Sequence, residues 1–124
     1  MRLSIFLRQR LRAFEYAFSG WGHVLRSQPN AWIHALAGLL VILGGGILRL
    51  TRIEWALIVL AIGLVWMAET FNTGIEALCN LVHPSPHPLI KIAKDTSAAA
   101  VLIAALSAAI IGGIVFLPHL LALP

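Results

Sequence analysis

Three long apolar segments dominate the hydrophobic pattern of this chain. They cover residues 32–48, about 55–75 and 98–117, and each is close to the ~20 residues that a helix needs to cross a bilayer. A short link, 49–54, joins the first two, and the segment 83–96 joins the second to the third. Prolines in 83–96 prevent one continuous helix from running through it. The pattern therefore predicts helices over 32–50, 54–82 and 95–117 that contain the membrane spans.

The first 30 residues show the one-sided spacing of an amphipathic helix. Apolar residues recur there at steps of three and four, and Arg8, Arg12 and Glu15 fall on the opposite side. The apolar positions are Leu3, Leu7, Leu11, Phe14, Phe18, Trp21 and Leu25. This spacing predicts a surface helix over 1–30 that lies in the lipid headgroup region, with its arginines toward anionic lipid. Whether this helix is only an anchor or also takes part in function stays open.

The amino-acid composition also indicates a membrane protein. Of the 124 residues, 60% are hydrophobic and 11% charged, with a mean hydropathy of +0.91. These values lie outside the range of soluble domains and predict an integral membrane protein. At this length we expect a single domain over 1–124, all-α, with no nucleic acid among its partners.

The distribution of positive charge predicts the orientation. Arginines 2, 8, 10, 12 and 26 precede the first span, and Lys91 and Lys94 lie between the second and third. Arg49 and Arg52 lie in the intervening link and are partly offset by Glu54. The positive-inside rule then places the N-terminus and the proline-rich segment in the cytoplasm. We expect a multi-pass protein of the bacterial cytoplasmic (inner) membrane.

A polar stripe on the second span is the main candidate for chemistry. Its members follow one helical face: Glu69, Asn72, Thr73, Glu76 and Asn80. Ionised groups facing lipid cost ~2.5–3.5 kcal/mol each on insertion scales, so the stripe must face protein, water or a substrate. It could carry function or only hold helices together by hydrogen bonds.

The two glutamates of the stripe differ in depth. Seven residues separate them, which is about 10 Å along a helix. Glu76 is then near the interface, where it can meet a hydrated cation and phosphate, and Glu69 is deep enough to meet the hydroxyl of a lipid. His34 is the one polar interruption of the first apolar segment, and we expect it to hydrogen-bond within the bundle rather than to act in catalysis.

Lys94 and Asp95 precede the third span at the same predicted surface as Glu76. A lysine there can hold a phosphate or anchor the topology. The aspartate can cap the third span or help to hold a metal ion.

Several short blocks form a specific combination. They are ETFNTGIEAL at 69–78, HPL at 87–89, AKD at 93–95 and AAVLIA at 99–104, together with YAFSGWGHVL at 16–25 and NAWIH at 30–34. The combination resembles the prokaryotic diacylglycerol kinase family, which includes undecaprenol kinases of similar length. The resemblance covers nearly the whole chain. It implies an ATP-dependent lipid kinase with three spans and a surface helix, assembled as a homotrimer whose sites are shared between subunits.

The resemblance also implies roles for individual residues. Glu69 would be the catalytic base that takes the proton of the lipid hydroxyl, and Asn72 would orient groups beside it. Glu76 would bind the Mg²⁺ that accompanies ATP, and Lys94 and Asp95 would contact the phosphates and their surroundings. The remaining nucleotide contacts would come from Tyr16, from one of Arg8, Arg10 and Arg12, and from Pro86, His87 and Pro88 near the adenosine.

Two positions depart from the family pattern. Gln28 stands where the family commonly has a glutamate as a second metal ligand, and Asn80 stands where it commonly has an aspartate. An amide oxygen can still ligate Mg²⁺ but brings no charge, so both changes remove negative charge from the nucleotide side.

Other functions remain possible from the residues alone. A small oligomeric transporter could use Glu69 as a proton relay, and a scaffold protein could use the stripe only to hold helices together. The apolar spans do not discriminate diacylglycerol from undecaprenol as the substrate.

Overall fold

The computed structural model describes residues 2–122, and the side chains from residue 6 onward. It contains four helices in this range, α1 (Arg2–Ser27), α2 (Pro29–Ile47), α3 (Arg52–Val82) and α4 (Pro88–Leu121). The last three are long and apolar enough to cross a membrane. The predicted all-α architecture of one amphipathic helix followed by three candidate spans is therefore confirmed.

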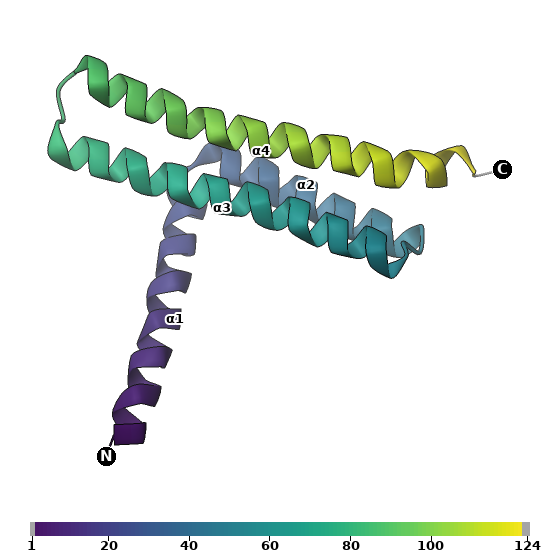
Figure 1. The fold of residues 1–124 in the computed structure, drawn as a ribbon, viewed down its shortest axis with the longest axis horizontal. Helices are drawn as coiled ribbons and strands as arrows, with labels where there is room; N and C mark the ends of the chain where they lie inside the picture. The colour runs from purple at the N-terminus through teal and green to yellow at the C-terminus, as the bar shows by residue number, and fades with distance from the viewer. Residues whose placement is uncertain (1, 123–124) are drawn as a thin grey trace.

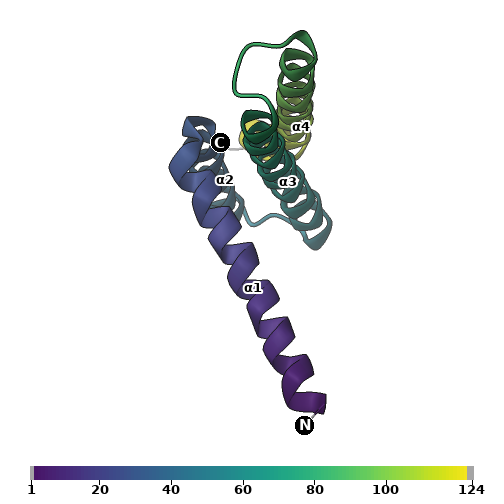
Figure 2. The ribbon, with the colours of Figure 1, turned by 90° about the vertical axis from the view of Figure 1, so that its left-hand side faces the viewer.

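Helices α2, α3 and α4 form an elongated bundle, and α1 leaves it at a steep angle (Figure 1). The α3–α4 pair makes the most extensive helix contact, and α2 packs mainly on α3. Figure 2 shows α1 pointing away from the other three helices along most of its length. Its apolar side, including Leu11, Phe14 and Phe18, is exposed within this single chain. This arrangement is the one expected of a helix lying on the surface of the membrane that the bundle crosses.

The break between the first two helices comes earlier than predicted. The expected surface helix over 1–30 ends at Ser27, and Gln28 is the extended N-cap residue of α2. Pro29 occupies the first position of α2, where its fixed φ favours a helix start and its missing N–H costs nothing. Near the end of α1, Trp21 makes an edge-to-face contact with Trp66 of α3, with ring centroids 5.3 Å apart. This contact fixes the end of α1 beside the middle of α3.

The last helix also begins earlier than predicted, at Pro88 rather than at residue 95. His87 is its N-cap residue, and the ring Nδ1 accepts a hydrogen bond from the backbone N–H of Leu89 at 3.2 Å. Again a proline at the first helical position starts the helix. Asp95 consequently lies inside α4, so the reading of this residue as a helix cap is wrong.

The opposite end of the bundle is fixed by a tight turn after α2. Arg49 adopts a positive φ of 55° there, and Gly45 makes room for the side chains of Leu50 and Trp55. Thr51 and Glu54 form a reciprocal capping box at the start of α3. The Glu54 carboxylate also lies 2.9 Å from His119 Nε2 of α4. These contacts hold the three helix ends together at the end far from the 83–87 connection.

Candidate functional site

The deep part of the α3 polar stripe faces protein, one of the three surroundings that the sequence allows. Glu69 is 1% exposed, and Asn72 and Thr73 are also buried. Glu76 is half-buried, and Asn80 is exposed near the end of the helix. The Thr73 hydroxyl donates to the backbone carbonyl of Glu69 at 2.9 Å, which satisfies it without using a side chain. The buried side chains of Glu69 and Asn72 both line a cavity.

Glu69 lines a cavity of about 220 Å³ between α2, α3 and α4. Its polar lining comes from three helical positions besides Glu69, namely Asn30 and His34 of α2 and Asn72 of α3. The rest is apolar, from Ile33, Ala98, Val101, Leu102 and Ala105. A small cavity with one buried carboxylate and few polar groups is suited to binding a hydroxyl group.

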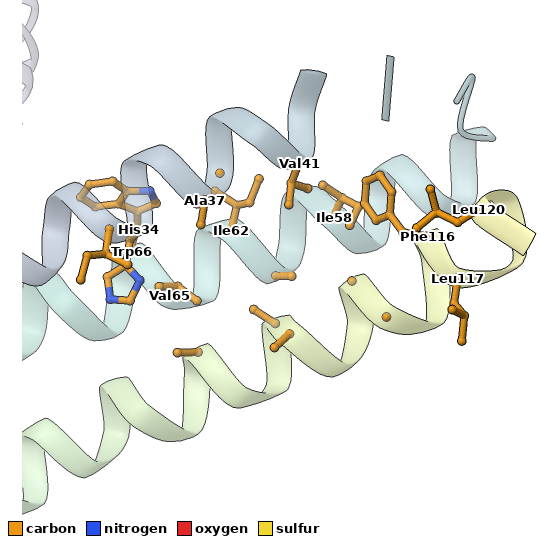
Figure 3. A pocket seen from close by; sticks show the side chains of 18 residues that line it. His34, Ala37, Val41, Ile58, Ile62, Val65, Trp66, Phe116, Leu117 and Leu120 are labelled. Carbon is orange, nitrogen blue, oxygen red and sulfur yellow. The ribbon is translucent and has the colours of Figure 1, made fainter. Parts of the chain in front are cut away.

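An apolar groove of about 580 Å³ continues from this cavity along the bundle. The two share Ile33, His34 and Ala105 in their linings. Figure 3 shows His34 and Trp66 near one end of the groove and Phe116, Leu117 and Leu120 near the other. The groove exists because α2 packs on α3 and leaves a gap toward α4, and small residues such as Gly112 and Gly113 line it.

His34 was not expected in the site. Its Nε2 lies 3.9 Å from Glu69 Oε2 and has no hydrogen-bond partner among the described residues, so the structure does not show the predicted hydrogen bond within the bundle from this atom and places it beside Glu69 instead. A single polar residue in an apolar span was the available signal, but sequence spacing within α2 cannot show which face of α3 it meets.

Asn72 is held by the helix opposite. The buried Ser97 of α4 donates its hydroxyl to Asn72 Oδ1 at 2.7 Å and lies 2.9 Å from the carbonyl oxygen of Lys94. This contact between α3 and α4 fixes the amide beside Glu69. Ser97 is a second site residue that sequence reasoning missed.

Gln28 and Glu76 meet at the end of the bundle near α1. Gln28 Nε2 donates to Glu76 Oε2 at 2.7 Å. Gln28 and Glu76, which are 48 positions apart in the sequence, are therefore neighbours. Two ligands of one metal ion, the role that the resemblance implies for them, have to be neighbours. The described residues contain no group of three or more His, Cys, Asp or Glu that could hold a metal ion. Magnesium commonly uses only one or two protein oxygens and takes the others from phosphates and water. The Glu76 carboxylate could supply one of them, and the Gln28 amide, which faces Glu76 with its nitrogen here, could supply a second after turning its oxygen toward the ion.

Lys94 lies at this same end of the bundle. Its Nζ donates to Asn80 Oδ1 at 2.6 Å, which places its charge on the side of α4 that faces the stripe. Asp95 is exposed and forms an ion pair with Lys91, one turn earlier on α4. The structure therefore brings Lys94, but not Asp95, into contact with the α3 stripe.

The other predicted nucleotide contacts are separate from the cavity in this chain. Tyr16 is 71% exposed and belongs to α1, the helix that leaves the bundle at a steep angle (Figure 1). Arg8, Arg10 and Arg12 are exposed on the same helix. A homotrimer with shared sites, as implied by the resemblance, would allow them to serve a neighbouring subunit.

The connection between α3 and α4 contains the last group of predicted residues. Pro86 and His87 are exposed in it and Pro88 begins α4. The rings of His83 and His87 lie 5.0 Å apart, so this connection is compact. It begins three residues after Asn80, at the end of α3, and therefore borders the end of the bundle that carries Glu76.

Comparison with known proteins decides the family. The sequence model of the prokaryotic diacylglycerol kinase family matches residues 15–116, which is most of the chain. The chain belongs to this family. The resemblance seen in the sequence blocks is therefore confirmed, and the protein is a member of a family of lipid kinases.

Two curated relatives show the same family relationship. A diacylglycerol kinase of Synechocystis sp. is 42% identical over 114 residues, which cover 91% of this chain and 65% of the relative. An undecaprenol kinase of Bacillus subtilis is 38% identical over 114 residues, which cover 92% of this chain and 93% of the relative. The chain thus spans just under two thirds of the first relative and nearly all of the second. The names of the two relatives differ in the lipid, so they do not decide which lipid this chain uses.

Proposed function

We propose that this protein transfers the terminal phosphoryl group of ATP to the hydroxyl of a membrane lipid, with Glu69 as the general base. The observation that carries the proposal is the burial of the Glu69 carboxylate in a small cavity that continues into an apolar groove. A lipid whose hydrocarbon part lies in the groove would present its hydroxyl to Glu69. A proton relay needs a buried carboxylate too, but it does not need Lys94 at the stripe or the Gln28–Glu76 pair.

The nucleotide would bind at the end of the bundle. Glu76 and the amide oxygen of Gln28 are the side chains that would hold Mg²⁺, which offsets the negative charge of the phosphates when it is bound. Lys94 adds a positive charge beside them and would stabilise the charge on the transferred group. We further propose that Tyr16, one of the α1 arginines and the 86–88 connection complete the nucleotide site, with α1 reaching a neighbour in a homotrimer. Asp95 would act in the surroundings of the phosphates, from its position beside Lys91.

In the proposed reaction, Glu69 removes the proton of the lipid hydroxyl as that oxygen attacks the γ-phosphorus of ATP. The bond from the γ-phosphorus to the bridging oxygen breaks, and ADP leaves with that oxygen. Asn72, held by Ser97, orients the reacting groups beside the base. A lipid bound in the groove and cavity would cover Glu69 and keep water from competing with its hydroxyl.

The charge distribution supports a cytoplasmic location for this end of the bundle. α1 with its arginines, Lys91 and Lys94 gather there, whereas Arg49 and Arg52 at the other end lie near Glu54. We propose that the protein spans the bacterial cytoplasmic membrane with its N-terminus inside, where ATP is available.

The test uses the purified protein in mixed micelles with ATP labelled on the terminal phosphate. Diacylglycerol and undecaprenol are offered in turn, and we expect label in at least one lipid. Glu69→Gln keeps the size of the side chain but removes proton acceptance, so turnover should fall by ~10²–10⁴. Glu15→Gln on the exposed side of α1 is the matched control. A folded protein that labels neither lipid, or a Glu69→Gln variant with normal turnover, would contradict the proposal.

A further inference from the structure

The environment of His34 is unusual for a residue in a membrane-spanning helix. Its side chain is 16% exposed and that of Glu69 is 2% exposed. Its Nε2 is buried and has no hydrogen-bond partner among the residues that the structure describes. A buried polar nitrogen left without a partner costs free energy, so a packing role alone does not account for a histidine at this position.

The position of the imidazole relative to Glu69 indicates a further role for His34. Its Nε2 lies 3.9 Å from Glu69 Oε2, which is about 1 Å longer than a hydrogen bond. Both side chains line the small cavity, and His34 also stands at the start of the apolar groove (Figure 3). His34 is therefore one of the three residues, with Ile33 and Ala105, that line both the groove and the cavity, so a lipid that spans the two would lie beside its ring.

We propose that His34 is the positioning residue of the base. This inference rests on the proposed function. With a lipid alcohol in the cavity, the ring closes the gap and Nε2–H donates to Glu69 Oε2. The neutral tautomer with its proton on Nε2 is sufficient for this, so no buried positive charge is needed. Holding one carboxylate oxygen leaves the other oriented toward the hydroxyl that it deprotonates.

The position of His34 also predicts what it does not affect. Gln28 and Glu76 form their contact at the end of the bundle, about two turns of α3 away from Glu69. Loss of the imidazole should therefore lower kcat and leave the KM for ATP nearly unchanged. A residue needed only for packing would instead lower the amount of folded enzyme and leave the kcat of the folded fraction intact.

The experiment compares His34→Leu with His34→Gln in the full-length protein, using lipid phosphorylation in mixed micelles and thermal unfolding in detergent. Leucine keeps the bulk but has no donor, so kcat should fall about 10- to 100-fold. The glutamine amide nitrogen reaches the position of Nε2 and donates without titrating, so His34→Gln should retain kcat within about threefold. His23→Leu, on the exposed side of α1, is the matched control. Equal kcat in the wild type and in folded His34→Leu would overturn the proposal.

A second comparison covers the case in which His34→Leu does not fold. The asparagine amide nitrogen ends near the position of Nδ1 and cannot reach Glu69, so His34→Asn should lose kcat where His34→Gln keeps it. Equal kcat in these two variants would equally overturn the proposal. Combining His34→Leu with Glu69→Gln should lower kcat no further than Glu69→Gln alone, because the ring acts through the carboxylate. If His34→Leu does not fold, His34→Asn takes its place in the double variant.

The two proposals fail in different ways. If the wild type phosphorylates neither lipid, or if Glu69→Gln is fully active, the proposed function is wrong. If Glu69→Gln is inactive but the His34 variants keep the wild-type kcat, Glu69 remains the base and only the positioning role of His34 is wrong.

Discussion

Replacing Gln28 with glutamate is a direct test of the proposed Mg²⁺ site, because it changes the charge with little change in shape. In the structure the Gln28 amide donates to Glu76 Oε2 at 2.7 Å. The variant replaces this hydrogen bond with two facing carboxylates. Without a cation they repel each other, and with a divalent cation between them both become ligands.

The size of the effect follows from the separation of the two side chains. Two unit charges ~4 Å apart interact by about 1 kcal/mol in water and about 4 kcal/mol at an effective dielectric constant of about 20. Glu76 is half-buried, so the repulsion should lie between these values. Because ~1.4 kcal/mol corresponds to a factor of ten in an equilibrium constant, relief of the repulsion by Mg²⁺ should strengthen Mg²⁺ binding about tenfold or more.

Two measurements check this prediction. The initial rate of lipid phosphorylation is measured against free Mg²⁺, and the concentration for half-maximal rate should fall about tenfold in Gln28→Glu. The melting temperature in detergent should fall in EDTA and recover when Mg²⁺ is added. The chain's other glutamine, Gln9, is exposed on α1, and Gln9→Glu should change neither quantity. An unchanged Mg²⁺ requirement in Gln28→Glu, with no effect of Mg²⁺ on its melting, would refute the assignment of this pair as the metal site.

Two further predictions concern the supports of the site. Ser97→Ala removes the donor that holds Asn72. We expect a loss of about 1 kcal/mol in stability, a size typical of hydrogen bonds between membrane helices, and a lower kcat. Unchanged stability in a denaturant titration and unchanged kcat in the assay would count against the role of Ser97. Gly45→Ala places a Cβ 2.9 Å from Leu50 Cδ1 and 3.0 Å from Trp55 Cη2, so it should destabilise the protein by ~1–3 kcal/mol. The neighbouring Gly46 has open space around the corresponding Cβ position, so Gly46→Ala is the control for Gly45→Ala in the same unfolding measurement. Equal stability of the two variants would contradict the packing argument.

The predicted helix boundaries show where local sequence rules succeed and where they mislead. Apolar runs of bilayer length located the three candidate spans, because a membrane demands both continuous apolar surface and internally satisfied backbone groups. The sequence predicts that the helix of the third span begins at residue 95, yet α4 begins at Pro88. A proline both ends one helix and starts another, and its position alone does not show where the next helix begins.

The sequence by itself determined that Glu69, Asn72 and Thr73 share one face of a helix and must avoid lipid. The helical period fixes which residues of one helix lie together, and the cost of exposing polar groups to hydrocarbon fixes that they turn inward. The same reasoning also indicated that Glu69 is deep and Glu76 is near the end of the span.

Only the tertiary structure decided which partners these residues meet. His34 approaches Glu69, Ser97 holds Asn72, and Lys94 rather than Asp95 reaches the stripe. Each of these contacts depends on how α2 and α4 are rotated and shifted against α3. That rotation is set by side-chain packing along whole helices, which residue spacing within a single helix does not contain.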